Sequence, residues 1–252
     1  MISPAKVKVF AHRGGRAHYP ENTLVAFAGA MKAGVHGIEL DVQRCASGEL
    51  VVFHDVTLAR TTNGQGRLAD TTLDDLKKLS AGAWYRPEFE SERVPTLLEV
   101  LDLVDGTVVV NIEVKNCPVD YPGIEDDLLQ TIGHYKYPDQ LIISSFDHQL
   151  LKAVSEKSDL EVAILSAGVL HDISGYSAAL NANFWHPEFE LLRPDAVEEA
   201  HLIELKVNTW TVNGPDDWKQ ALEANVDGII TDDPDGLIEF LDQLTLVSES
   251  IC

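Results

Sequence analysis

The sequence predicts an α/β fold, a (β/α)8 TIM-type barrel with a small insertion after the second strand. Short apolar runs alternate with amphipathic stretches along all 252 residues, as they do in a parallel sheet wrapped in helices. About eight such units in a chain of this length match the size of a TIM barrel. A doubly wound open sheet is the alternative, but no G-x-G-x-x-G sequence follows the first predicted strand. We therefore expect residues 1–252 to form a single barrel domain.

Most of the predicted strands are rich in valine and isoleucine, and several are continuously apolar. Strands of this composition are typically buried on both faces of a parallel sheet. The predicted strands are Lys6–Ala11, Gly37–Val42, Leu50–His54, Val108–Lys115, Leu141–Phe146, Glu161–Leu165, Ala182–Trp185, Val207–Val212 and Val226–Thr231.

Several predicted helices begin or end at residues that favour a helix terminus. Asn22 and Thr23 are N-cap residues, and Gly34 is suited to follow the last turn of the first helix. Three later helices have a proline in the first turn. The predicted helices are Glu21–Ala33, Thr96–Val104, Gly123–His134, Asp147–Lys157, Ser174–Leu180, Pro194–His201, Pro215–Asn225 and Pro234–Leu244.

Residues 56–95 interrupt the alternation of strands and helices. This segment is polar, contains the sequence TTNGQG at residues 61–66, and has one short helical pattern at Leu73–Leu79. Loops of this length are usually functional or disordered. We expect an insertion that lies over the mouth of the barrel.

The net charge of −22, from 41 acidic and 19 basic side chains, disfavours some partners. Such a negative field repels nucleic acids and anionic membrane surfaces. A small anionic substrate is compatible with it only where a metal or local cations reverse the sign. The sequence has no run of 18 or more apolar residues, so we expect no stable membrane insertion.

The cysteines and the first residues indicate the cellular compartment. Cys45, Cys117 and Cys252 are odd in number and form no C-x-x-C pair, so a disulfide framework is not expected. Residues 1–6 lack the charged-then-apolar order of a signal peptide. We therefore expect a cytoplasmic protein. The oligomeric state is open, and a homo-oligomer is compatible with the sequence.

Polar side chains cluster at the carboxyl ends of the first predicted strand units, where TIM barrels carry their active sites. His12 and Arg13 follow the first strand. Glu39 and Asp41 lie two residues apart in the second strand, so their side chains share a face. For the same reason Glu113 shares a face with Lys115 in the fourth predicted strand.

The three carboxylates Glu39, Asp41 and Glu113 predict a metal site. Neighbouring buried carboxylates repel one another and lose hydration, and a bound cation relieves both costs. An all-carboxylate site suits Mg²⁺ or Ca²⁺, with Mn²⁺ as a further option, rather than zinc. In the alternative interpretation, Glu39 and Asp41 form salt bridges with Arg13 and Arg44, and Glu113 pairs with Lys115 alone.

Two histidines and two cations beside these acids suggest acid-base chemistry on an oxyanion. One neutral imidazole of the pair His12 and His54 would accept a proton while the other, protonated, donates one to a leaving oxygen. Arg13 and Lys115 would hold phosphoryl oxygens together with the metal. A structural histidine bonded to the backbone is the alternative for His12. Trp210 either lines a substrate site or packs in the core.

Five short motifs resemble the glycerophosphodiester phosphodiesterase family in order and approximate spacing. They are His12-Arg13-Gly14, Pro20-Glu21-Asn22-Thr23, Glu39-x-Asp41, His54-Asp55 and Glu113-x-Lys115. The sequences at residues 94–97, 210–213 and 231–234 are similar to the family too, so the resemblance covers essentially the whole chain. We expect Glu21-Asn22-Thr23 to act mainly as a helix cap, and Asp55 to point away from His54 if the strand continues.

The resemblance implies a barrel enzyme that uses a metal to hydrolyse glycerophosphodiesters to sn-glycerol 3-phosphate and an alcohol. It implies His12 and His54 as general acid and base, and Arg13 and Lys115 at the phosphate. It implies that Glu39, Asp41 and Glu113 are the ligands of one divalent cation. Either the substrate's glycerol hydroxyl or water attacks phosphorus. The alternatives are a phosphodiesterase acting on lysophospholipids or sugar phosphodiesters, a non-catalytic barrel that binds phosphodiesters, and a metal-dependent isomerase or lyase.

Overall fold

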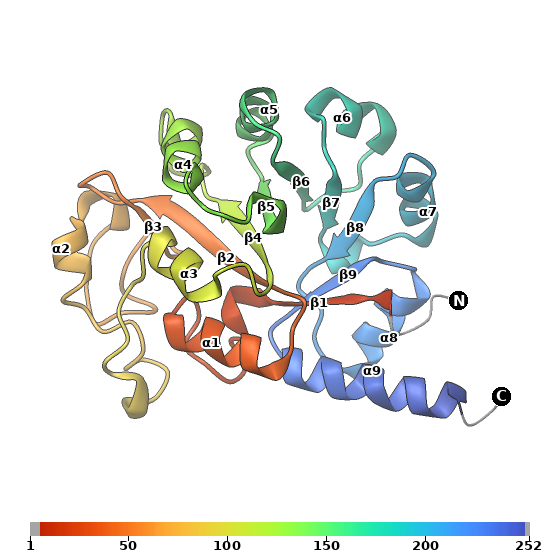
Figure 1. Cartoon of the computed structure of the whole chain (residues 1–252), viewed down its shortest axis with the longest axis horizontal. Helices are drawn as coiled ribbons and strands as arrows, with labels where there is room; N and C mark the ends of the chain where they lie inside the picture. The colour runs from red at the N-terminus through yellow and green to blue at the C-terminus, as the bar shows by residue number, and fades with distance from the viewer. Residues whose placement is uncertain (1–5, 250–252) are drawn as a thin grey trace.

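The computed structural model describes residues 6–249 as a closed barrel surrounded by helices (Figure 1). The described residues form a nine-stranded sheet, and every neighbouring pair except β2 with β3 is parallel. The ring closes because β1 pairs with both β2 and β9. The predicted TIM-type barrel is confirmed. The expectations about residues 1–5 and about Cys252 lie outside the described residues.

The barrel strands agree with the predicted ones, with ends that are unchanged or shifted by up to three residues. They are β1 (Lys8–Ala11), β2 (Gly37–Arg44), β4 (Val109–Val114), β5 (Leu141–Ser145), β6 (Glu161–Ser166), β7 (Phe184–Pro187), β8 (Lys206–Thr209) and β9 (Gly228–Thr231). Nearly all of their residues are buried, since helices cover the outside of the ring and side chains fill its interior.

The strand β3 (Leu50–Val52) is not part of the ring. It pairs antiparallel with β2, and Val52 lies opposite Val42. Residues 45–49 between the two strands are too few for a crossover, which needs a dozen or more residues, and they form a hairpin turn with Gly48 at φ 104°. The apolar run was therefore a correct prediction of a strand but not of a parallel barrel strand.

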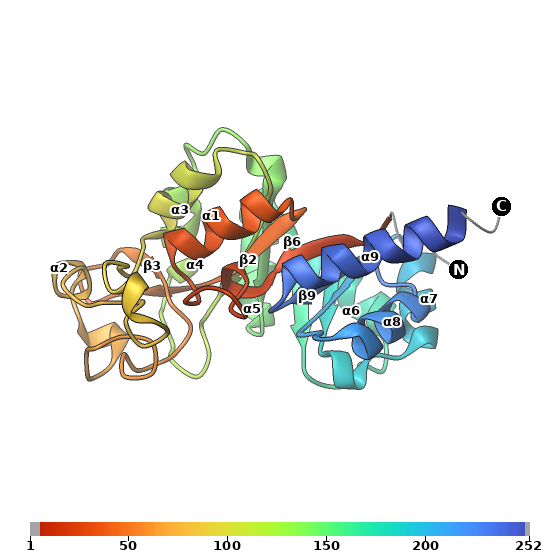
Figure 2. The ribbon, with the colours of Figure 1, turned by 90° about the horizontal axis from the view of Figure 1, so that it is seen from below.

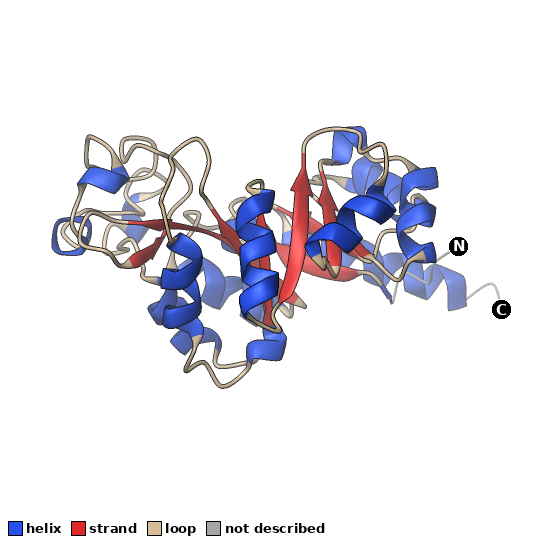
Figure 3. Cartoon of the chain, turned by 90° about the horizontal axis from the view of Figure 1, so that it is seen from above, coloured by secondary structure: helices blue, strands red, loops and turns tan. Residues whose placement is uncertain are grey.

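The helices lie around the outside of the barrel (Figure 3). They are α1 (Leu24–Ala33), α2 (Leu73–Leu76), α3 (Leu97–Val104), α4 (Ile124–Ile132), α5 (His148–Lys157), α6 (Ile173–Leu180), α7 (Pro194–Leu202), α8 (Pro215–Glu223) and α9 (Pro234–Glu249). The side chain of Thr23 caps α1, and Thr96 forms a capping box with Glu99 at the start of α3. The helices α1 and α9 are in contact on the outside of the barrel, where they meet near their ends (Figure 2).

Two of the three buried clusters show how the helices and the insertion segment pack on the barrel. A large cluster joins the outer faces of the strands to the helices, including Ile38, Ile112 and Val207. A smaller one joins the segment predicted as an insertion to the hairpin of β2 and β3; its members are Cys45, Val51, Phe53, Leu58, Leu68, Leu76, Ala81 and Val94. The insertion segment thus packs its apolar side chains against those of the hairpin and the residues beside it. No helix among residues 6–249 combines the length and the apolar character that crossing a bilayer requires.

Candidate active site

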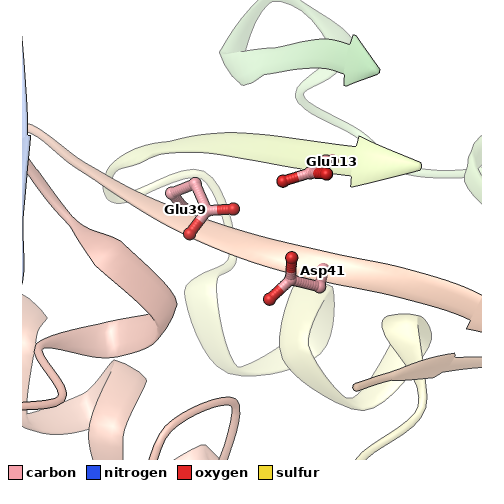
Figure 4. A group of neighbouring side chains, drawn as sticks. All are labelled: Glu39, Asp41 and Glu113. Atoms are coloured by element: carbon pink, nitrogen blue, oxygen red, sulfur yellow. The ribbon is translucent and has the colours of Figure 1, made fainter. Parts of the chain in front are cut away.

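Three carboxylates converge at the carboxyl end of the barrel. Glu39 and Asp41 come from β2, and Glu113 comes from the adjacent strand β4, where it lies directly opposite Asp41. One oxygen atom of each lies within 4.8 Å of the others. Figure 4 shows the three groups turned toward one another. The predicted juxtaposition of these acids is therefore present.

The electrostatics of these acids fit a divalent cation. Burial raises the pKa of Glu39 well above its usual range, and the charges of Asp41 and Glu113 raise it further. Burial also raises the pKa of Glu113, although Lys115 opposes this. A group of oxygen ligands this close and this buried carries unfavourable charge that a cation bound among them would neutralise. The donor set therefore suits a hard metal ion.

Two side-chain cations border the carboxylates. Arg13 Nε lies 3.2 Å from Asp41 Oδ2, and Lys115 Nζ lies 3.1 Å from Asp41 Oδ1. These two cations hold the pKa of Asp41 well below its usual range, although burial alone would raise it. Lys115 also pairs with Glu113. In the alternative interpretation, Arg44 was expected to form a salt bridge with Glu39 or Asp41. In the described residues Arg44 pairs instead with Asp127 on α4.

The backbone after β1 is shaped to place Arg13. Arg13 has φ 51°, and Gly14 follows with φ 87°. A non-glycine residue in the left-handed region costs about 1 kcal/mol or more, and such residues are concentrated at functional sites. The turn directs the Arg13 N–H at Glu39 Oε2, 3.0 Å away. A side chain at Gly14 would place a Cβ only 2.7 Å from that of Ala26, so glycine is required for α1 to pack here.

His12 is held by a carboxylate from the other end of the chain. Its Nδ1 lies 2.6 Å from Asp232 Oδ1, in the loop after β9. Because an ionised carboxylate only accepts, Nδ1 carries the proton and Nε2 is left free. Nε2 lies 3.9 Å from Glu39 Oε2, so the free nitrogen faces the carboxylates. Burial lowers the pKa of His12, and the hydrogen bond with Asp232 opposes that effect.

His54 is held in the same way, because the strand does not continue to Asp55 as the expectation for that residue had assumed. The chain leaves β3 at Val52, so Asp55 does not point to the opposite face but accepts from His54 Nδ1 at 2.7 Å. Gln43 fixes this bend, since its Nε2 donates to the carbonyls of Phe53, His54 and Asp55. Burial lowers the pKa of His54, and the charge of Asp41 opposes that effect. His54 and Lys115 line one cavity, so the second histidine also converges on the site.

The motif at residues 20–23 does more than cap a helix. Only Thr23 caps α1. Asn22 Nδ2 donates to Asp41 Oδ2 at 2.8 Å, and Glu21 accepts from Arg13 NH1 at 2.8 Å. The expectation that all three serve mainly as a cap is thus corrected for two of them. Glu21 and Asn22 orient a cation and a carboxylate of the site.

Arg60, in the segment predicted as an insertion, was missed. Its Nε donates to Asp55 Oδ2 at 2.6 Å, and its NH1 donates to Glu21 Oε2 at 2.8 Å. It thereby joins the residue that holds His54 to the residue that holds Arg13. The only local signal was its place before the polar sequence at residues 61–66, and nothing in that pattern shows which acids it contacts.

Trp210 directly follows β8, and it lies partly in the core and partly beside an exposed aromatic ring. Its Nε1 donates to the carbonyl of His186 at 2.8 Å, and its ring packs against the buried cluster inside the barrel. The ring is also in edge contact with Phe146, at 5.6 Å between centroids, and Phe146 is exposed. A role for Trp210 in substrate binding stays a prediction.

The fold and the site together define a class of protein, a TIM-type barrel with an acidic cluster that could hold a metal ion beside two histidines and two side-chain cations. The model of the "Glycerophosphoryl diester phosphodiesterase family" matches residues 12–236, and this chain belongs to that family. The predicted family and the predicted enzyme class, a phosphoric diester hydrolase, are confirmed.

Individual relatives agree with this assignment over nearly their whole length. The chain is 42% identical to "Glycerophosphodiester phosphodiesterase" of Caldanaerobacter subterraneus subsp. tengcongensis, over 94% of this chain and 98% of the relative. It is 36% identical to the protein of the same name from Bacillus altitudinis, over 94% and 99%. Among solved structures, an Oleispira antarctica phosphodiesterase in complex with the product sn-glycerol-3-phosphate superimposes with a TM-score of 0.87 at 26% identity, covering 93% of this chain and 96% of that one.

Proposed function

We propose that this chain hydrolyses glycerophosphodiesters to sn-glycerol 3-phosphate and an alcohol with the help of one divalent cation. The observation that carries the proposal is the convergence of Glu39, Asp41 and Glu113 to within 4.8 Å, with a histidine on either side held by a carboxylate. Mg²⁺ and Ca²⁺ suit these ligands, and Mn²⁺ has the same preference for oxygen. When bound, the cation supplies positive charge for the phosphoryl oxygens.

The roles of the remaining side chains follow from their positions. His12 and His54 share the proton transfers, since each has one nitrogen held by a carboxylate and the other nitrogen free. Arg13 and Lys115 add positive charge beside the same oxygens and hold Asp41 in its ionised form. Trp210 borders the substrate. The attacking oxygen comes either from the substrate's glycerol hydroxyl or from water.

The direct test is release of glycerol 3-phosphate from glycerophosphocholine. The product is measured with a coupled dehydrogenase, with each of the three cations added in turn to purified, metal-stripped protein. We expect turnover that depends on the added cation. Absence of product from glycerophosphocholine, glycerophosphoethanolamine and glycerophosphoinositol with every cation would contradict the proposed function. A cyclic glycerol phosphate trapped at early times would assign the attack to the glycerol hydroxyl.

The small-molecule substrate and the compartment belong to the same proposal. Cys45 and Cys117 are both free thiols in the described chain, which supports a reducing environment such as the cytoplasm. Fractionation of cells that express the chain from its own gene would place the activity in the cytoplasmic fraction.

We further propose that Arg60 positions the catalytic residues. Arg60→Met would remove the donors to Asp55 and Glu21, leaving Asp55 without its cation and Glu21 with Arg13 alone. Because each hydrogen bond to a charged group contributes about 1.5–3 kcal/mol, we expect kcat to fall by about 10- to 100-fold, with a smaller change in KM. Steady-state kinetics on glycerophosphocholine measure both constants.

Two further variants separate positioning from simple loss of stability. Arg60→Lys keeps the charge but cannot form both two-pronged contacts, so we expect partial recovery of kcat. Arg86→Met is the matched control, because Arg86 lies in the same segment, is exposed and, among residues 6–249, has side-chain contacts only with Glu88 and the Tyr85 ring. Equal losses in Arg60→Met and Arg86→Met would argue against a specific role for Arg60.

A further inference from the structure

A cavity of about 470 Å³ opens beside the catalytic centre. Two of its lining side chains, His54 and Lys115, belong to the catalytic machinery proposed above. Much of the remaining lining is apolar and includes Val56 from the insertion segment, Val119 from the loop after β4, and Phe146 after β5. A group that enters this cavity is therefore in contact with His54 at one end and with apolar surface at the other.

The polar side chains of the cavity are mostly bonded to other protein groups. Gln43 donates to three carbonyls and accepts from the Tyr121 hydroxyl at 3.1 Å. Asp55 is bonded to His54 and to Arg60. Lys115 is paired with two of the carboxylates. Among the described lining residues, little hydrogen-bonding capacity is left beyond His54 Nε2, which the proposed reaction uses, the exposed Thr57 hydroxyl and the Cys117 thiol.

This shortage of partners discriminates between the two ends of a glycerophosphodiester. The glycerol end carries two free hydroxyls, each of which loses a hydrogen bond to water on entry and finds few replacements here. The same cost applies to the ammonium of ethanolamine, which has three N–H donors. An alcohol whose far end carries methyl groups loses nothing of this kind and gains contact with Val56, Val119 and the Phe146 ring.

We propose that this cavity receives the departing alcohol, and that it selects alcohols that end in methyl groups, such as choline, over those that end in hydrogen-bond donors. This inference rests on the proposed hydrolysis, and it assigns one histidine to the attacking oxygen and the other to the departing alcohol. The attacking oxygen forms a new bond to phosphorus and passes its proton to His12. The bond from phosphorus to the alcohol oxygen breaks, and that oxygen takes a proton from His54, which lines the cavity.

Three diesters of sn-glycerol 3-phosphate test the selection directly. Their alcohols are choline, 3,3-dimethylbutanol, which has the same shape without the charge, and ethanolamine. We expect kcat/KM for the first two to agree within about threefold, and that for ethanolamine to be at least about tenfold lower, the usual effect of one unpaired donor. Equal rates for ethanolamine and choline would overturn the proposal. So would a poor rate for dimethylbutanol beside a good one for choline, because recognition would then depend on charge.

Substitutions that place a larger side chain in the cavity provide a second, independent test of its role. Cys117→Trp places a large ring at an exposed position of the lining, so the ratio of kcat/KM for the choline diester to that for the methyl diester should fall by about tenfold or more. Val56→Phe narrows the cavity from the insertion side and should change the ratio in the same direction. Leu202→Trp, on the exposed face of α7, is the control and should leave the ratio unchanged. An unchanged ratio in both cavity variants would overturn the inference and leave the hydrolysis standing, whereas inactivity toward every diester would remove both.

Discussion

Replacing His12 or His54 by alanine is expected to lower kcat for glycerophosphocholine by about 10²–10⁴, the usual contribution of a general acid or base. Each ring has its Nδ1 bonded to a carboxylate, so the proton-transferring nitrogen is already oriented before substrate binds. Alanine removes the proton carrier but none of the carboxylates or cations that bind the phosphate. KM should therefore change less than kcat, and steady-state kinetics at saturating cation will show the difference.

Variants of the two carboxylates that hold the histidines test the same roles with smaller expected losses of activity. Asp232→Asn and Asp55→Asn keep both rings but weaken the bond that selects their tautomer, so each should lose less than the corresponding alanine variant. His134→Ala, an exposed histidine after α4, should retain full activity. Full activity in either His12→Ala or His54→Ala would exclude that histidine from the proton transfers.

Removal of the divalent cation is expected to abolish turnover, and its return to stabilise the fold. A cation at 100 times its dissociation constant stabilises the folded state by about 2.7 kcal/mol. For a chain of this size that corresponds to a rise in Tm of about 5–10 °C. Thermal unfolding of stripped and reloaded protein measures the shift, and the coupled assay measures the turnover.

Glu39→Gln separates the binding of the cation from the stability of the barrel. Glutamine keeps an oxygen that can accept from the Arg13 N–H but removes a charge that burial and two neighbouring acids disfavour. The metal-free variant should therefore unfold at the same temperature as the stripped parent or higher, and show little rise in Tm with cation. Asp102→Asn, an exposed acid on α3, should behave as the parent protein does. A cation-dependent rise in Tm that survives in Glu39→Gln, Asp41→Asn and Glu113→Gln would place the metal elsewhere.

The site residues that could be recognised from the sequence lie in or directly after a predicted strand. Glu39, Asp41 and Glu113 are charged residues inside apolar strands, where each is locally conspicuous and where alternation of side chains predicts its direction. His12 and Arg13 were recognisable because they follow the first strand. The residues that were missed or misassigned lack such a context. Arg60 and Asp232 lie in loops, and their contacts with Glu21 and His12 join segments that are distant along the chain.

Local pattern alone was sufficient for the barrel, for the order of its strands and helices apart from the place of β3, and for the face on which the acids meet. These features follow from periodicity and from capping residues, which act over a few neighbours and can be recognised in a short stretch of sequence. Packing of distant segments decided the rest. The hairpin of β2 and β3 bends the chain so that Asp55 reaches His54, and the insertion brings Arg60 to both acids. Loop conformation depends on the summed contacts of many remote side chains, and no repeating pattern in the sequence encodes that sum.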